Sequence, residues 1–143
     1  MPRPLHLLLC VATVACSDPF PPPPNPMGTS VDITTDRTVY GPSDSSIVTV
    51  RNLTGQAMQF NLCPGALQRW TGSTWATVDA WPGPGAAACA LIGGALSPNA
   101  TYSARFTIHA GAGTGSYRFE FFAIEMGNQL PIGDRVSHQF EVR

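Results

Sequence analysis

The chain has 143 residues, a length that suits one ordinary domain with appendages and is short for two. Hydrophobic residues make up 43% and charged residues 12%, and a net charge of −1 gives no electrostatic reason to expect nucleic acid as a partner. Fourteen glycines and fourteen prolines predict many turns and little helix.

Residues 1–15 carry the features of a signal peptide. Arg3 supplies a positive charge near the start, and the apolar run from Leu5 to Ala15 follows it. This run is much shorter than the roughly 20 residues that a membrane-spanning helix needs. A basic start, a short apolar run and a small residue at its end predict export and cleavage.

The residues Thr13-Val14-Ala15-Cys16 resemble a bacterial lipobox, although Thr13 departs from the usual aliphatic residue. The resemblance implies lipidation of Cys16 and a stable membrane anchor of several acyl chains. Ser17 follows the cysteine, which by resemblance to enterobacterial lipoproteins favours the outer membrane. The alternative is an ordinary signal peptide, with Cys16 left as a thiol.

A proline-rich linker is predicted at 16–30. The stretch from Asp18 to Ser30 contains six prolines, a composition typical of extended polyproline II. We expect it to act as a tether between the lipid anchor and the domain. The alternative is a docking motif for an SH3-like partner, because Pro21 to Pro24 follow Phe20 directly.

Residues 31–143 show short alternating stretches separated by turn residues. Strands are expected at 31–35, 46–53, 56–63, 66–70, 74–78, 100–108, 115–126 and 135–143, and 38–44 is interpreted as a tyrosine followed by a turn. Pro64-Gly65 is interpreted as a turn, and 81–95 as a long loop rich in glycine, proline and alanine.

The strand at 115–126 is the most informative of these. Tyr117, Phe119 and Phe121 share one face, while Arg118 and Glu120 share the other, which we expect to be in contact with water. Three rings on one face require a second sheet packed against them. About seven to eight strands at spacings of roughly 8–12 residues predict an all-β, antiparallel β-sandwich.

Several local motifs recur in a fixed order along this region: Val39–Asp44, a strand ending at Asn52, Cys63, Trp75, Leu96–Asn99 and Gly115–Arg118. In that order they resemble the bacterial immunoglobulin-like domains of exported lipoproteins. The resemblance implies an immunoglobulin-like fold over 31–143 and no catalytic residue. The intracellular proteinase inhibitor of bacilli is a more distant look-alike.

Cys63 and Cys89 are the two cysteines of the domain, with 25 residues between them. An exported domain usually pairs two such cysteines. In the chain-entropy model, the disulfide would contribute about 3.5 kcal/mol by restraining the unfolded chain. The alternatives are two separate thiols or a metal-binding pair.

Trp70, Trp75 and Trp81 form the candidate binding surface. Exposed tryptophans can bind a sugar ring or a peptide. The alternative is that one is the core tryptophan of the sandwich and another covers an edge.

No enzyme signature is found. His109 and His138 have no spacing to Met58 or Met126 that favours a copper site. There is also no nucleophile elbow of the Gly-x-Ser-x-Gly kind and no phosphate-binding glycine loop.

We therefore expect a non-catalytic module without metal or cofactor. It would bind an envelope protein or extracellular ligand, or serve as an architectural spacer in the envelope. The alternatives are protease inhibition through the 81–95 loop and a hydrolase or metal enzyme dependent on His109 or His138.

Overall fold

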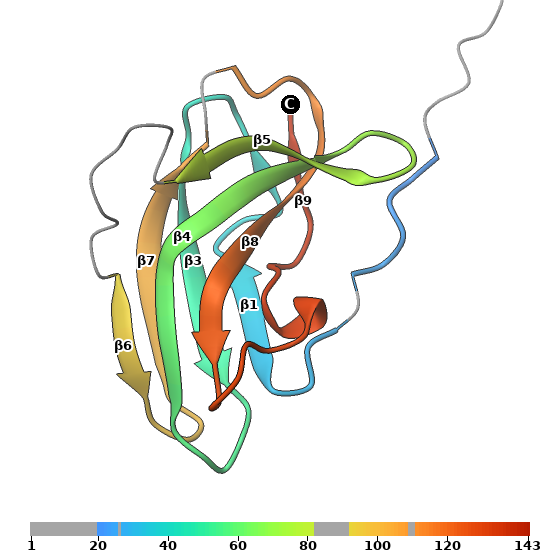
Figure 1. Ribbon diagram of the computed structural model, residues 1–143. Coiled ribbons are helices and arrows are strands. Elements are labelled where there is room, and N and C mark those ends of the chain that lie inside the picture. The colour runs from blue at the N-terminus through green and yellow to red at the C-terminus, as the bar shows by residue number, and fades with distance from the viewer. Residues whose placement is uncertain (1–19, 26, 82–91, 109–110) are drawn as a thin grey trace, which may run out of the picture.

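The computed structural model describes residues 20–25, 27–81, 92–108 and 111–143. Two β-sheets pack face to face, which confirms the predicted all-β sandwich (Figure 1). The antiparallel three-stranded sheet has the order β1-β3-β7, with β1 at Val31–Thr35, β3 at Ser45–Asn52 and β7 at Thr101–Thr107.

The second sheet has six strands and the order β2-β9-β8-β4-β5, with β6 also paired to β4. Its strands are β2 (Val39–Tyr40), β4 (Met58–Trp70), β5 (Trp75–Trp81), β6 (Gly93–Leu96), β8 (Gly115–Glu125) and β9 (Phe140–Val142). The β2–β9 pair is parallel. A short 3₁₀ helix spans Ile132–Asp134, and no helix in the described ranges is long and apolar enough to cross a membrane.

The core lies between the two sheets and is centred on β8. Tyr117, Phe119 and Phe121 are fully buried, as their alternation predicts. Phe106 of β7 packs across the sandwich on Phe119 and Phe121, with ring centroids 5.6 and 5.5 Å apart. Phe140 of β9 closes the cluster at 5.3 Å from Phe119.

Pro64-Gly65 is not the predicted turn, because β4 continues through it. The register with β8 shifts between Asn61 and Gly65, so the proline lies in a bulge, where its missing N–H breaks no ladder hydrogen bond. A Cβ at Gly65 would lie 2.8 Å from the Trp81 ring and 2.9 Å from the Glu120 carbonyl oxygen. Glycine is needed here because the neighbouring strand and the Trp81 ring come too close for a side chain. A sequence pattern cannot distinguish a glycine with this role from a glycine in a turn.

The interpretation of 81–95 as one loop is wrong at both ends. Trp81 is the last residue of β5, and Gly93–Leu96 forms β6 against β4. A Cβ at Gly93 would lie 2.3 Å from the Phe60 carbonyl oxygen, so glycine permits this pairing. Residues 82–91 lie outside the described residues.

The turn around Asp36 makes the stability of the fold dependent on pH. Asp36 Oδ1 accepts hydrogen bonds from the Ile47 N–H at 2.7 Å and from the Tyr40 hydroxyl at 2.9 Å. Partial burial raises the pKa of Asp36, but these hydrogen bonds outweigh it and hold the pKa below the usual 3.8. A lowered folded-state pKa contributes stability above the unfolded pKa, and this is lost as the pH falls through the folded-state value.

We therefore expect the free energy of unfolding to fall less steeply in Asp36→Asn than in wild type as the pH is lowered from about 4 to 2. Urea unfolding of wild type and variant across pH 7 to 2 measures this slope. Glu125→Gln, at an exposed residue of β8, is the control and should keep the wild-type slope. Parallel curves for wild type and Asp36→Asn would contradict the assignment.

Candidate functional site

The outer face of the six-stranded sheet carries a row of connected polar side chains. Arg118 Nε donates to Gln68 Oε1 at 2.8 Å, and Gln68 Nε2 in turn donates to Glu120 Oε2. Arg135 Nη1 reaches Glu120 Oε1 at 3.3 Å. These contacts connect β8, β4 and the segment that follows the 3₁₀ helix.

This face is less exposed to solvent than the sequence predicts, because Arg118 is only 7% exposed. Its guanidinium lies over the Trp75 ring, 4.5 Å from the centroid. Burial lowers the pKa of Arg118, and the neighbouring Glu120 carboxylate opposes that shift. Buried polar groups in proteins are normally hydrogen-bonded, and the buried Arg118 guanidinium follows this rule. Its hydrogen bonds indicate that the side chains of this face have a defined arrangement.

The structure divides the three candidate tryptophans between two environments. Trp81 packs on the core rings Phe106, at 5.3 Å, and Phe119, at 6.1 Å, and its Nε1 donates to the Leu62 carbonyl at 2.9 Å. It is the core tryptophan that the alternative interpretation allowed. Trp70 and Trp75 remain on the outer face, both half-buried, with ring centroids 5.5 Å apart.

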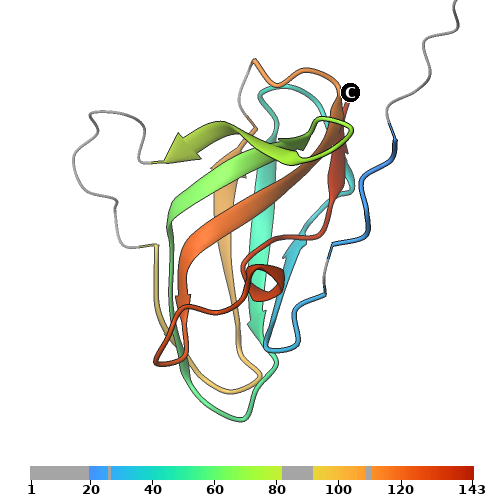
Figure 2. The ribbon, with the colours of Figure 1, turned by 45° about the vertical axis from the view of Figure 1, so that its right-hand side comes forward.

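The described part of the proline-rich linker lies against this same face. Figure 2 shows residues 20–25 in blue, passing alongside β9. Trp70 Nε1 donates to the Phe20 carbonyl at 2.8 Å, and Gln139 Nε2 donates to the Pro23 carbonyl at 2.7 Å.

Asn25 is the main clamp of this segment. Its Oδ1 accepts from Arg118 Nη1 at 3.1 Å and from Gln139 Nε2 at 3.2 Å, while its Nδ2 donates to the Ser137 carbonyl. The residues from 20 to 25 therefore contact the domain through side chains of β4, β8 and the 135–139 segment. The domain boundary at 30/31 stays a prediction.

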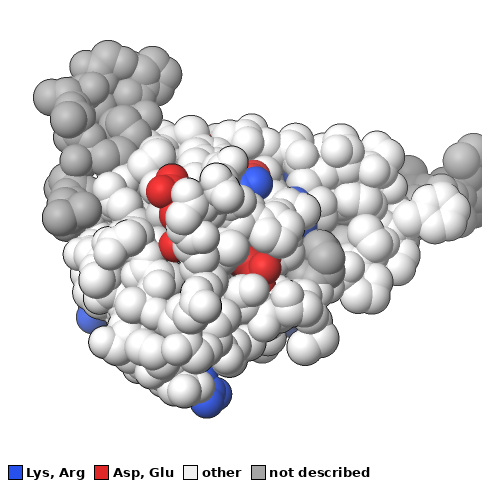
Figure 3. Space-filling view, turned by 60° about the horizontal axis from the view of Figure 1, so that its bottom comes forward, with Lys and Arg blue, Asp and Glu red and all other residues white. Residues whose placement is uncertain are grey.

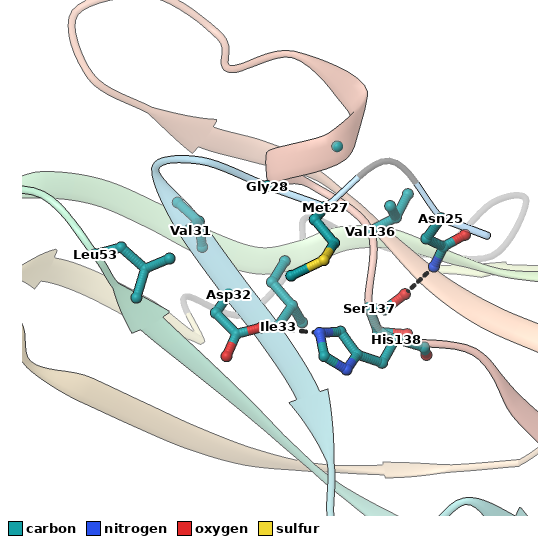
Figure 4. Close-up of a pocket in the computed structure, with 11 residues that line it drawn as sticks. Asn25, Met27, Gly28, Val31, Asp32, Ile33, Leu53, Val136, Ser137 and His138 are labelled. Carbon is teal, nitrogen blue, oxygen red and sulfur yellow. Dashed lines mark hydrogen bonds and ion pairs between the residues drawn. The ribbon is translucent and has the colours of Figure 1, made fainter.

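Two hollows lie beneath the linker. The first, of about 550 Å³, is lined by Phe20, Pro21 and Pro22 of the linker and by domain residues that include Trp70 and Ser116. The second, of about 200 Å³, lies under Met27 and Gly28 and has an apolar floor that includes Val31, Ile33 and Val136 (Figure 4). Asn25 stands at the rim of the second hollow, between the two stretches of linker.

His138 lies beside a carboxylate at the surface. Its Nε2 lies 3.0 Å from Asp32 Oδ1 at the rim of the second hollow, and the His138 side chain is 58% exposed (Figure 4). The Ser137 hydroxyl is buried, accepts from the Phe119 N–H and donates to the His138 carbonyl, so it is engaged by the backbone. His109 lies outside the described residues.

Metal ligation finds no support in the described part of the chain, where no three His, Cys, Asp or Glu side chains gather to hold an ion. Met58, weighed for a copper site, is fully buried in the core. The end of the molecule seen in Figure 3 shows acidic and basic side chains scattered in small groups.

The predicted disulfide and lipid anchor stay predictions. Cys63 is 7% exposed in β4, while Cys89 and Cys16 lie outside the described residues.

Sequence reasoning missed four residues of this site: Asn25, Gln68, Arg118 and Gln139. Alternation along β8 does place Arg118 outward, and that is the one signal that could have included it. The contacts that join these residues span sequence separations of 50, 93 and 114 positions, which no local pattern reveals.

No protein-family model matches the chain, and no curated protein does either. Among solved structures it is similar to the sporulation control protein Spo0M of Bacillus subtilis, with 15% identity and a TM-score of 0.45. A second similar structure is the alkylpurine DNA glycosylase AlkC of Pseudomonas fluorescens bound to DNA, with 12% identity and a TM-score of 0.34. The matches cover 79% and 81% of this chain but only 48% and 31% of those proteins, and both likenesses are too weak to carry an argument.

Proposed function

We propose that the chain is a non-catalytic cell-envelope lipoprotein whose immunoglobulin-like domain is a binding module. Its binding surface is the outer face of the six-stranded sheet around Trp70, Trp75 and Arg118. The observation that carries this is the Trp70–Trp75 pair beside the buried Arg118, on a face that already holds an extended segment. Tryptophan and arginine are the residues most enriched at binding hot spots.

The strand order supports the immunoglobulin-like part of the proposal. Strands β1-β3-β7 facing β4-β8-β9 correspond to A-B-E facing C-F-G in that fold. Tyr117 stands near the start of β8, and its hydroxyl donates to the Gly113 carbonyl at 2.6 Å, as in a tyrosine corner. The chain departs from the fold in β6, which pairs with β4 rather than with β7.

The lipoprotein part of the proposal rests on residues 1–16 and is tested separately. The intact mass of protein extracted from its native membrane should equal residues 16–143 plus acyl chains. A mass without lipid would contradict the anchor and would indicate an exported domain that diffuses freely.

Binding by the sheet face is tested by retention of envelope components on the immobilised domain. We expect a Trp70→Ala, Trp75→Ala double variant to lose retained components that wild type keeps. Ile47→Ala, an exposed apolar residue on β3 of the other sheet, is the control and should behave as wild type. Equal retention by all three proteins would contradict the assignment of the face.

Protease inhibition through 81–95 remains the alternative within binding functions. Most of that segment lies outside the described residues, and no observation favours it over the sheet face.

A further inference from the structure

The linker presents its backbone carbonyls to the domain in a regular way. Prolines lack an N–H, so a proline run offers only carbonyl oxygens for backbone hydrogen bonding. Polyproline II has three residues per turn and no internal hydrogen bonds, so carbonyls three positions apart point to the same side. Within residues 20–25, Phe20 and Pro23 are three positions apart, and both of their carbonyls accept hydrogen bonds from the domain.

The domain places a side-chain donor at each of these two carbonyls. Trp70 Nε1 and Gln139 Nε2 are fixed donors for the two carbonyls, and Arg118 and Gln139 both donate to the side chain of Asn25. Trp75 stands beside Trp70 and adds aromatic surface. An aromatic surface with donors aimed at proline-run carbonyls is the chemistry by which domains recognise polyproline II segments.

The linker fills this surface incompletely. Phe20 is 82% exposed, and the hollow between Phe20–Pro22 and the sheet has a volume of about 550 Å³. Of the four prolines at 21–24, only Pro22 is half-buried and the others are exposed. The linker is therefore held mainly by its hydrogen bonds, and a segment that placed apolar rings in the hollow would bury more surface.

We propose that this face is a groove for extended, proline-rich segments of a partner protein, and that residues 20–25 are its intramolecular ligand. Binding of the partner segment replaces the linker on Trp70 and Gln139. The inference rests on the proposed function, since it names the ligand class of the same face. A covalently attached ligand acts at an effective concentration in the millimolar range, so the partner must bind more tightly than the linker does.

The test uses the full mature chain and a synthetic peptide of residues 19–26 as probe. Asn25→Ala removes the clamp and should raise the affinity for the peptide about five-fold or more, because three hydrogen bonds of the internal ligand are lost. Adding Trp70→Phe to this variant removes the indole donor and should lower the affinity again. A peptide with alanine at every proline is the matched control and should not bind.

Equal affinity of wild type and Asn25→Ala for the peptide would overturn the role of the linker as internal ligand. If a variant with all of residues 20–25 replaced by glycine and serine is folded by circular dichroism and binds no peptide, the groove is overturned. Light scattering at rising concentration would detect dimers that exchange residues 20–25. Such dimers would mean that the groove binds this segment of a second copy of the chain, and they would overturn the proposal of a different partner protein. The proposed function would stand even if the proline-rich ligand were overturned, provided that retention of envelope components on the immobilised domain still depends on Trp70 and Trp75.

Discussion

Replacing Phe119 with alanine is expected to lower the free energy of unfolding by about 3–5 kcal/mol. Phe119 is fully buried, and its ring packs on Phe106, Trp81 and Phe140 at centroid distances of 5.6, 6.1 and 5.3 Å. The variant leaves a cavity where both sheets meet, and close-packed neighbours can fill it only in part. Urea unfolding followed by circular dichroism measures the loss.

Phe122→Ala is the matched control for this variant. Phe122 lies on the same strand but is 38% exposed, so its truncation should cost less than about 1 kcal/mol. Similar losses for the two variants would mean that the core does not lie where β8 and β7 face each other.

Replacing Asn52 with aspartate is expected to cost about 3 kcal/mol or more at neutral pH. Asn52 is fully buried, and its Nδ2 donates to the carbonyls of Gln56, Leu96 and Ser97 at 2.7, 3.1 and 3.2 Å. A carboxylate of the same shape would bring a negative oxygen to these acceptors, so the connection of β3 to the end of β6 would be lost. Thermal and urea unfolding both report this change.

Asn61→Asp serves as the control because Asn61 uses the opposite end of its amide. Its Oδ1 accepts from the N–H groups of Cys63 and Ile92 at 3.0 and 3.1 Å, and a carboxylate oxygen can do the same. We expect little loss in this variant. A loss equal to that of Asn52→Asp would show that a new charge, rather than the loss of the Nδ2 hydrogen bonds, is responsible.

The fold could be predicted from the sequence wherever a strand buries one face and leaves the other polar. The alternation at Tyr117, Phe119 and Phe121 places the core correctly, and a period of two is all that this requires. The same logic failed at Pro64-Gly65, because a bulge and a turn share their residue types. Whether the chain reverses or continues there depends on the close approach of Trp81 and β8 to Gly65.

The candidate site was predicted only in part. Trp70 and Trp75 were named together with Trp81 as a candidate binding surface, but nothing local distinguishes them from Trp81, whose burial depends on Phe106 and Phe119. Alternation put Arg118 on the outward face, yet its burial comes from Trp75 and from a segment 93 residues away. Tertiary contacts of this kind decide how far the outer face of a sheet is exposed to solvent.

The proline-rich linker shows the same limit. Its composition predicts an extended conformation and a spacer role. The bonds of Phe20 to Trp70 and of Pro23 to Gln139 join positions that are 50 and 116 residues apart. Only the folded domain shows that the carbonyls of the linker meet donors at a spacing of three residues.

The most direct measurement is the NMR resonance of the Trp70 indole N–H in a chain that keeps residues 20–25 together with the domain. If residues 20–25 occupy the face, this proton should be protected from solvent exchange, and its resonance should shift in Asn25→Ala. Adding the proline-rich peptide to that variant should restore the protected state. An indole N–H that exchanges freely, with the same resonance in wild type and Asn25→Ala, would contradict the central claim that this face binds an extended proline-rich segment.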